Sequence, residues 1–198
     1  MMAGRGRAGG PPGDLDTAIG AAKLGLVPVR TDAFDLGGLH LTSGAGRRLE
    51  LFVSIDDFML GGERYSVPSE LVPVMLDVSR TTANGYALRL RFTAGVSGPC
   101  MRCLEEATPA IPVESREVSQ PGESDQLRSP YLEGAVLDLH GWARDALALS
   151  LPAKLLCQPD CAGLCPVCGA NMNTAGSEHG HEPAPDPRWA KLSEIRFE

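Results

Sequence analysis

The chain has 198 residues, of which 43% are hydrophobic and 22% charged, a composition typical of a globular protein. Its 18 basic and 25 acidic side chains give a formal charge of −7, so the molecule as a whole does not attract nucleic acid or an acidic membrane surface. It contains no run of 18 apolar residues and no apolar N-terminal stretch of the signal-peptide kind. We therefore expect a cytoplasmic protein with no membrane contact, whose cysteines stay reduced.

The first part of the chain divides into an extension and a β domain. Residues 1–26 are rich in glycine and are expected to form a disordered N-terminal extension. Residues 27–156 are predicted to form an antiparallel β domain with one helix. We place its first strand at Val27 to Phe34, a loop at Gly44 to Arg48 and another strand at Leu49 to Ile55.

The clearest strand pattern lies between residues 72 and 92. Apolar residues occupy alternate positions from Val72 to Val78 and again from Tyr86 to Phe92, which is the period of a strand with one buried face. Between the two runs, Asn84-Gly85 can adopt the positive φ of a tight turn. The pattern predicts a β-hairpin whose second strand leads to Cys100, and a third strand is predicted at residues 109–118.

Four arginines lie in a stretch that is free of acidic residues, between Asp77 and Glu105. They are Arg80, Arg89, Arg91 and Arg102. Arg89 and Arg91 share the polar face of one strand, so this set is our candidate for an RNA-binding surface that contacts phosphate groups. The alternative interpretation is that the arginines are solvated or paired with carboxylates of a neighbouring strand, such as Glu114 and Glu117.

One helix is predicted at about residues 138–151. The carboxylate of Asp138 can cap its N-terminus, apolar residues recur at helical spacing from Leu139 to Leu149, and Pro152 ends it. The apolar stripe is expected to face the core. The helix leads directly to Cys157, so it sets the position of the second group of cysteines.

Eight residues have the spacing of metal ligands. They are Cys100, Cys103, Cys157, Cys161, Cys165, Cys168, His179 and His181. Zinc prefers four thiolate or imidazole ligands in a tetrahedron, and a two-residue spacer directs two cysteines at one ion. Eight ligands suffice for two closed, structural Zn²⁺ sites per chain, so we interpret residues 157–182 as a zinc-binding module. Disulfides, or buried thiols that only pack, are the alternative.

Two pairings of these ligands are open. In the first, Cys100 and Cys103 join Cys157 and Cys161, and the second site combines the remaining two cysteines with the two histidines. In the second pairing, the two Cys-x2-Cys motifs share one ion, as in a zinc ribbon. We favour the first pairing because ligands that are neighbours in the chain close short loops at a lower entropic cost.

The end of the chain carries a further helix signal. Residues 183–198 are predicted to be a Pro-rich spacer followed by a C-terminal helix that begins at Asp186-Pro187. Trp189 and Leu192 fall on one face of that helix, and docking of Trp189 on the domain is favoured over a role as an anchor for a partner.

No catalytic signature accompanies the cysteines. The upstream His-x-Glu that a zinc deaminase needs is missing, and neither a phosphate loop nor a nucleophile elbow occurs. A thiol-redox role for Cys100 and Cys103 is the enzyme-like alternative. It requires a lowered thiol pKa, which is typical of a helix N-terminus, whereas this pair follows a predicted strand. We therefore expect no enzymatic activity.

Several segments occur together in a characteristic order over about residues 27–196. They are Gly98 to Glu105, Tyr131 to Gly134, Leu151-Pro152, Cys157 to Cys161, Gly163 to Gly169 and Asp186 to Trp189. In this combination the chain resembles the YceD family, the large ribosomal RNA subunit accumulation proteins, and most resembles its high-GC Gram-positive (actinobacterial) branch. Many relatives carry Cys-x-Cys where this chain has His179-Gly180-His181, an equally suitable ligand pair.

The resemblance implies a cytoplasmic α+β protein, with a mainly antiparallel β domain, a few helices and a Cys/His zinc-binding module. It also implies a role in the synthesis, processing or stability of 23S ribosomal RNA without known catalysis. Large-subunit ribosomal RNA or ribosomal proteins are the expected partners, and no DNA binding is expected. The alternatives are a thiol-redox or chaperone-like protein, or an adaptor whose zinc module docks a protein without contact to RNA.

Overall fold

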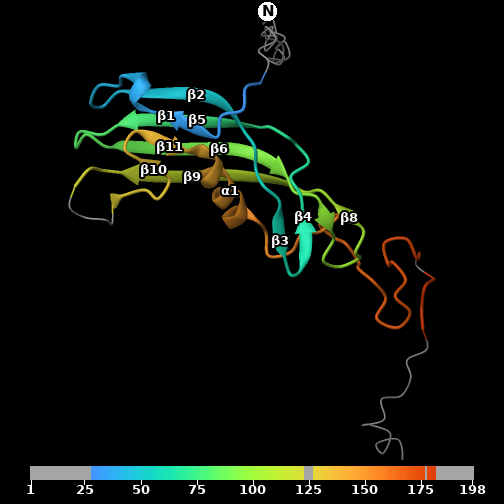
Figure 1. Cartoon of the computed structure of the whole chain (residues 1–198). Coiled ribbons are helices and arrows are strands. Elements are labelled where there is room, and N and C mark those ends of the chain that lie inside the picture. The colour runs from blue at the N-terminus through green and yellow to red at the C-terminus, as the bar shows by residue number, and fades with distance from the viewer. Residues whose placement is uncertain (1–27, 123–126, 177, 182–198) are drawn as a thin grey trace, which may run out of the picture.

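A four-stranded antiparallel sheet dominates the structure, a computed structural model that describes residues 28–122, 127–176 and 178–181 (Figure 1). Its strand order is β2-β5-β6-β9. The strands are β2 (Gly46–Val53), β5 (Val72–Arg80), β6 (Tyr86–Gly95) and β9 (Ala110–Ser119). Every neighbouring pair is antiparallel, so the predicted fold class, α+β with a mainly antiparallel β domain, is confirmed.

The predicted hairpin and third strand are both confirmed. Leu76 of β5 lies opposite Leu90 of β6, and the connecting turn holds Asn84 at a φ of 63°. The hydroxyl of Thr81 accepts a hydrogen bond of 2.9 Å from the N–H of Gly85, which closes this turn. β9 returns along β6 over its whole length.

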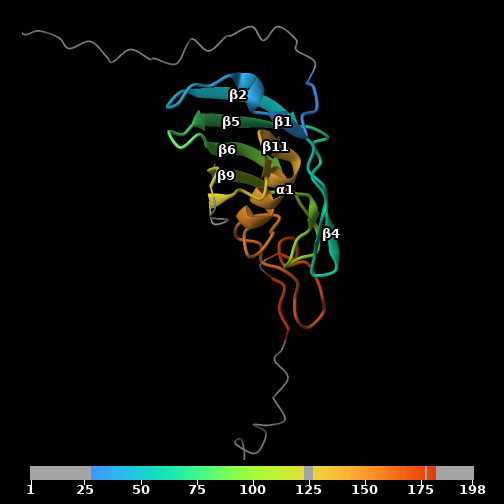
Figure 2. The ribbon, with the colours of Figure 1, turned by 60° about the vertical axis from the view of Figure 1, so that its left-hand side comes forward.

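One face of this sheet is covered by helix α1 (Leu139–Ser150). Asp138 caps the helix by accepting a hydrogen bond of 2.9 Å from the N–H of Gly141, as the sequence predicts. Trp142 is buried beneath the helix, and its indole N–H donates to the hydroxyl of Ser115 on β9 at 2.9 Å. The alternate apolar residues of β5, β6 and β9 pack here, so the core lies between sheet and helix (Figure 2).

Three small sheets complete the fold. β1 (Ala33–Asp35), β11 (Val136–Asp138) and β10 (Leu132–Glu133) form one of them, in the order β1-β11-β10. The other two are the pairs β3 (Phe58–Leu60) with β4 (Glu63–Tyr65), and β7 (Gly98–Pro99) with β8 (Glu106–Ala107). A 3-10 turn, η1, spans Gly37–Leu39. The cysteine-rich segment follows α1 and extends from the β4 and β8 end of the molecule (Figure 1).

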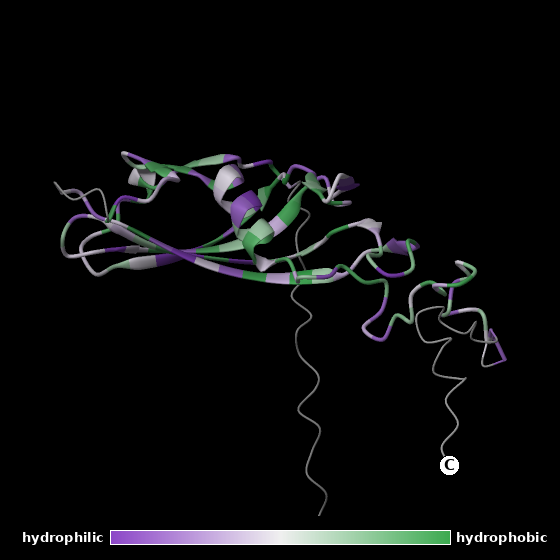
Figure 3. Ribbon diagram, turned by 90° about the horizontal axis from the view of Figure 1, so that it is seen from below, coloured by the Kyte–Doolittle hydropathy of each residue, from purple (hydrophilic) through white to green (hydrophobic). Residues whose placement is uncertain are grey.

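The other face of the four-stranded sheet, which we call the bare face, is not covered by any helix or strand in the described part of the chain. In Figure 3 the helix and the β1-β11-β10 sheet lie on one side of the strands, and no described helix or strand lies on the opposite side. The outward residues of β5 and β6 are polar or charged at Asp77, Arg89 and Arg91, in keeping with their contact with solvent.

Several sequence-based bounds need correction. β1 spans only Ala33–Asp35 rather than Val27 to Phe34, and the predicted loop at Gly44 to Arg48 is wrong because β2 already begins at Gly46. Gly46 and the two arginines after it pair with β5 through backbone hydrogen bonds, which need no apolar side chain and so leave no alternating pattern. The predicted extension at 1–26 and the spacer and helix at 183–198, with Trp189, lie outside the described residues.

Replacing Trp142 by alanine should destabilise the domain, because it leaves a cavity between α1 and β9. Truncation of a buried tryptophan typically costs about 3–5 kcal/mol. Leu149→Ala on the same helix is the matched control: the predicted core-facing stripe is wrong at Leu149, which is 87% exposed while Leu147 is buried, and a surface change of this kind stays within about 0.5 kcal/mol. Urea denaturation of both variants would measure this, and equal midpoints would contradict the packing described here.

Candidate metal centres and the arginine face

The first cluster contains four cysteines from two distant segments. They are Cys100, Cys103, Cys157 and Cys161, whose sulfurs all lie within 4.8 Å of one another. Cys100 and Cys161 are 3.8 Å apart between sulfurs and 61 residues apart in sequence. Cys103 and Cys157 are 3.5 Å and 54 residues apart. All except Cys157 are buried.

The turn that carries the first two cysteines is held from several sides. The N–H of Cys100 donates to Glu105 at 2.7 Å, and the N–H of Leu104 donates back to Cys100 at 3.0 Å. Leu104 has a φ of 64°, which lets the turn close around the sulfurs. The N–H of Met101 donates to the carbonyl of Leu155 at 2.9 Å, which fixes the turn to the segment before Cys157.

The strand before this turn is itself anchored to the β3–β4 hairpin. The ring of Tyr65 lies against Gly98, where an added Cβ would come within 2.2 Å of a ring carbon. The hydroxyl of Tyr65 donates to the carbonyl of Pro99 at 2.9 Å. Glycine at position 98 is therefore a steric requirement of the approach to Cys100.

The second cluster is local in sequence and more exposed. It contains Cys165, Cys168, His179 and His181, again within 4.8 Å of one another. The N–H of Gly169, at a φ of 74°, donates to the carbonyl of Cys165 at 2.8 Å, so the two cysteines form a tight turn. Nε2 of His179 lies 3.5 Å from the sulfur of Cys168 and 3.1 Å from Nε2 of His181.

These distances fit two tetrahedral metal sites. With metal–sulfur bonds of about 2.3 Å, a tetrahedron separates two sulfurs by about 3.8 Å. With metal–nitrogen bonds of about 2.0–2.1 Å, it separates sulfur from nitrogen by about 3.5 Å and two nitrogens by about 3.3 Å. The observed separations lie close to these values. The Nε2 atoms of His179 and His181 face each other, and this close approach is explained if the lone pairs of both nitrogens point at one cation.

The local electrostatics favour thiolates in both clusters. Burial raises the pKa of Cys100, but the N–H groups of Cys103, Arg102 and Cys157 outweigh it and bring the pKa to about 6. The side chain of His179, with backbone N–H groups of the turn, lowers the pKa of Cys165 to about 6. Since the thiolate is the form that binds metal, each cluster has at least one ligand largely deprotonated at neutral pH.

The two clusters are joined through Asn173. Its side-chain N–H donates to the sulfur of Cys161 at 3.4 Å, which lowers the pKa of that thiol. Its side-chain oxygen accepts from the N–H of Ala162 at 2.7 Å. In the chain, however, Asn173 belongs to the loop between Cys168 and His179 of the second cluster. One loop therefore closes the second cluster and supports the first.

The structure brings together the ligand sets of the favoured pairing. The zinc-ribbon pairing would join Cys100 and Cys103 to Cys165 and Cys168, which lie in different clusters here. Loop closure alone predicted this grouping, but the role of Asn173 was missed. Its signal was no more than an Asn-x-Asn sequence within the loop.

The four predicted arginines lie in three places. Arg89 and Arg91 project from the bare face of the sheet, as predicted. Arg80 continues the inward-facing positions of β5 and lies over the ring of Tyr86, at 4.4 Å. Arg102 is exposed in the first cysteine turn. The four side chains therefore do not form one surface.

Ion pairs hold the arginines of the bare face, in part as the alternative interpretation predicts. Arg89 donates to Glu114 at 2.7 Å, whereas Arg91 donates to Asp77 at 2.8 Å. Glu117 faces the other side of the sheet, opposite Leu88. Two further arginines that the sequence did not single out join these pairs: Arg48 lies 2.6 Å from Asp77, and Arg116 lies 2.9 Å from Glu114. The register of β2 with β5 reveals the first pair, and the second joins residues two apart on β9.

Replacing Asp77 by asparagine should lower stability in a pH-dependent way. The hydrogen bond from Arg48, supported by Arg91, lowers the pKa of Asp77 below its ordinary value of 3.8. A folded-state pKa below the unfolded one contributes stability that is complete above the ordinary value and is lost as the pH falls through the lowered one. The urea midpoint of the variant should lie below that of the parent at neutral pH, and the two should converge near about pH 2.

The matched control is Glu50→Gln, because Glu50 is an exposed acid on the same face with no ion pair in the described structure. The urea midpoint of the Glu50 variant should equal that of the parent at neutral pH and at acid pH. A difference between the parent and the Asp77 variant that persists unchanged at acid pH would refute the ion-pair account.

Taken together, these features define an α+β protein in which an antiparallel sheet carries two Cys/His clusters of the metal-ligand type. A family model described as "Large ribosomal RNA subunit accumulation protein YceD" matches residues 88–196. That stretch is more than half of the chain and includes all eight ligands. The chain belongs to the YceD family.

Individual relatives are also similar. Uncharacterised proteins of Mycobacterium bovis and Mycobacterium tuberculosis are 38% identical over 122 residues, which cover 58% of this chain and 58% of each relative. The chloroplastic large ribosomal RNA subunit accumulation protein YCED homolog 1 of Zea mays is 38% identical over 53 residues, 27% of this chain and 18% of that protein. No solved structure matches the chain. No helix among the described residues has the length and apolar character needed to span a bilayer.

Proposed function

We propose that the chain is a non-enzymatic zinc-binding factor in the synthesis, processing or stability of large-subunit (23S) ribosomal RNA, acting in the cytoplasm. The observation that carries the proposal is that both four-ligand clusters lie within the stretch matched to a family named for accumulation of this RNA. Ribosomal RNA or ribosomal proteins are the proposed partners, and no role is proposed in DNA binding.

The donor sets favour zinc in a structural role. Four cysteines in one cluster, and two cysteines with two histidines in the other, are ligand sets of closed tetrahedral zinc sites, which keep no open position for a reacting water. Zinc, when bound, would supply a cross-link between chain segments. The protein's part is to present thiolates and imidazoles at the right distances, which the turn at Cys100 and the turn at Cys165 achieve.

The cysteine-rich segment needs such a cross-link. In the described part of residues 151–181 there is no helix or strand, and its one β-bridge joins Leu164 to Asn171. A structural zinc site contributes an apparent ~10–16 kcal/mol of binding free energy. That is comparable to the net stability of a whole domain, ~5–15 kcal/mol. Two ions can therefore order a segment that has almost no regular structure of its own.

Burial of the sulfurs argues against the thiol-redox alternative. Thiol–disulfide exchange requires that a partner reach the attacking sulfur. Cys100, the buried thiol whose pKa is lowered to about 6, is 0% exposed. A low thiol pKa at a buried site with three further sulfurs is better explained by metal ligation than by exchange.

The protein purified without chelator should contain two zinc ions per chain. His179→Ala with His181→Ala should release one ion and leave the four-cysteine cluster filled, because the two ligand sets do not overlap. Cys103→Ser should release the other and unfold the cysteine turn around it. Elemental analysis with thiol titration measures both effects.

The control is His40→Asn. His40 lies outside both clusters at a φ of 49°, a conformation that asparagine tolerates, so its zinc content should equal that of the parent. Parent protein without zinc, with all six cysteines freely titratable, would refute the zinc assignment. Loss of both ions from the double histidine variant would contradict the division of the eight ligands into these two sets.

Cells depleted of the chain should show a lower ratio of large-subunit to small-subunit ribosomal RNA. The parent and the His40 variant should restore the ratio, whereas Cys103→Ser should not, because the zinc-bound segment is unfolded. Quantification of total and precursor ribosomal RNA provides the measurement. An unchanged ratio after depletion would exclude this role.

A further inference from the structure

The bare face of the four-stranded sheet carries an arginine row. Arg48 of β2 lies directly opposite Asp77 of β5, Asp77 lies opposite Arg89 of β6, and Arg89 lies opposite Arg116 of β9. Neighbouring strands are about 4.8 Å apart, so the row crosses all four strands over about 14 Å. We use the term arginine row for Arg48, Arg89 and Arg116 together with Arg91, one pleat further along.

Each carboxylate in this row is shared by two guanidinium groups. Asp77 accepts from Arg48 and Arg91, and Glu114 accepts from Arg89 and Arg116. Each group of three residues therefore carries a net charge of +1. Glu50 is the other acidic residue at the outward positions of these strands, so the face is net positive in a chain whose formal charge is −7.

The two outer arginines of the row face solvent more than either carboxylate does, whereas Arg89 and Arg91, at 38% and 35% exposed, lie between Asp77 and Glu114 in exposure. The side chains of Arg48 and Arg116 are 64% and 69% exposed, against 24% for Asp77 and 44% for Glu114. The ion pairs of Arg89 and Arg91 use one terminal nitrogen of each guanidinium, and the Nε of both is buried without a partner, so the other terminal nitrogen of each is left for a ligand. The pairs therefore fix the arginines on the sheet and leave donors for a further acceptor.

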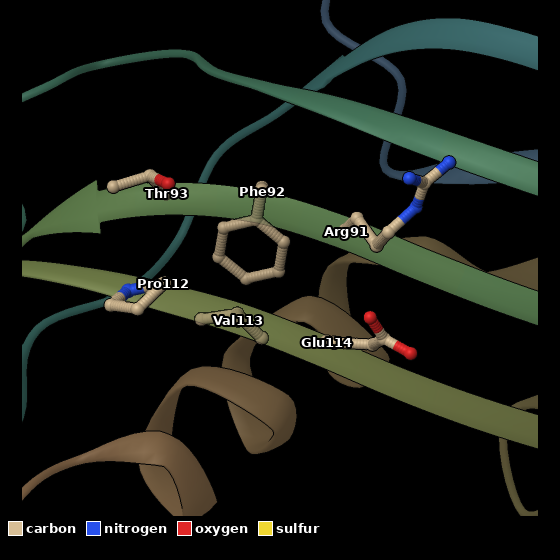
Figure 4. A pocket seen from close by; sticks show the side chains of 6 residues that line it. All are labelled: Arg91, Phe92, Thr93, Pro112, Val113 and Glu114. Carbon is tan, nitrogen blue, oxygen red and sulfur yellow. The ribbon is translucent and has the colours of Figure 1, made fainter.

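The shape of the face suits an extended anion. Two open hollows of about 390 and 400 Å³ lie along the row, one beside Arg91 and Glu114 and the other beside Arg89 and Arg116. In Figure 4 the first hollow is framed by Arg91 and Thr93 on β6 and by Pro112 and Glu114 on β9, with α1 beyond the strands. Among the outward positions the only aromatic residue is Phe52, which is half-buried. Phe92 also lines the first hollow but is only 8% exposed, so it offers little surface for stacking.

We propose that the arginine row binds the phosphate backbone of RNA, an inference that rests on the proposed function and specifies its contact surface. Guanidinium groups recognise phosphate through paired N–H donors. With one half-buried aromatic residue, the face offers little surface for base stacking, so the contact positions the RNA without reading its sequence. The ion pairs already restrict the arginine side chains, so less conformational entropy is lost when these side chains bind phosphate.

The test is the salt dependence of binding to a labelled 20-nucleotide oligouridylate, with zinc content verified for every protein. Arg48→Gln with Arg116→Gln leaves Asp77 paired with Arg91 and Glu114 paired with Arg89, so the fold is retained. The logarithm of the binding constant falls linearly with the logarithm of the salt concentration, and each phosphate contact on a single strand contributes about 0.7 to the steepness of that line. The double variant, which lacks two contacts, should therefore show a slope smaller in magnitude by about 1.4.

Two further variants separate a local contact from bulk charge. Arg30→Gln with Arg64→Gln removes the same charge from arginines paired with Asp32 and Asp57 outside the four-stranded sheet, and should leave the slope unchanged. Glu50→Gln removes an acid from the binding face, and should tighten binding, a gain that a purely structural role would not produce.

The inference is overturned if the parent does not bind RNA, if both double variants weaken binding equally, or if the arginine-row variant binds like the parent. Crosslinking from this face that captures protein and no RNA would also overturn it. The proposed function would still stand if the protein carried two zinc ions per chain and its depletion lowered the ratio of large-subunit to small-subunit ribosomal RNA. Neither result depends on which surface of the protein contacts RNA.

Discussion

The convergence of four cysteine sulfurs at the end of the sheet is the constraint on which the second half of this molecule depends. Cys100 and Cys161 are separated by 61 residues that include β9 and α1, yet their sulfurs lie 3.8 Å apart. The strand before Cys100, anchored by Tyr65, delivers one half of the cluster, and α1 delivers the other. The described residues after Cys157 (158–176 and 178–181) have little regular structure of their own and take their position from this junction.

The two faces of the sheet differ in their side-chain chemistry. Its inner face buries alternating Val, Leu and Phe residues against α1 and holds Trp142 through Ser115. Its outer face carries shared carboxylates that are each bound by two arginines. Exposed ion pairs of this kind contribute little to stability, typically below about 1 kcal/mol each. An excess of arginine over carboxylate is thus easier to understand as recognition chemistry than as a source of stability.

Local sequence patterns predict those elements whose determinants are local. The β5–β6 hairpin follows from alternation and an Asn-Gly turn, α1 follows from Asp138 and its apolar stripe, and the ligands follow from cysteine spacing. The start of β2 could not be predicted, because Gly46-Arg47-Arg48 pairs with β5 without an alternating apolar pattern in the sequence. The partners of Arg89 and Arg91 depend on the registers of two strand pairs, β6 with β9 and β5 with β6. The role of Asn173 was missed because this residue lies in the loop of the second cluster but donates a hydrogen bond to Cys161 of the first.

The position of Asn173 has a thermodynamic consequence. The loop from Cys168 to His179 is ordered by whatever holds the second cluster, and the same loop places an N–H donor on the sulfur of Cys161. Occupancy of one centre must then alter the affinity of the other, and linkage requires the effect to be equal in both directions. The two ligand sets are separate, but their metal affinities are coupled through this loop. A metal titration would then follow a cooperative isotherm, and a chelator that empties the exposed centre would lower the affinity of the buried centre without removing its ligands.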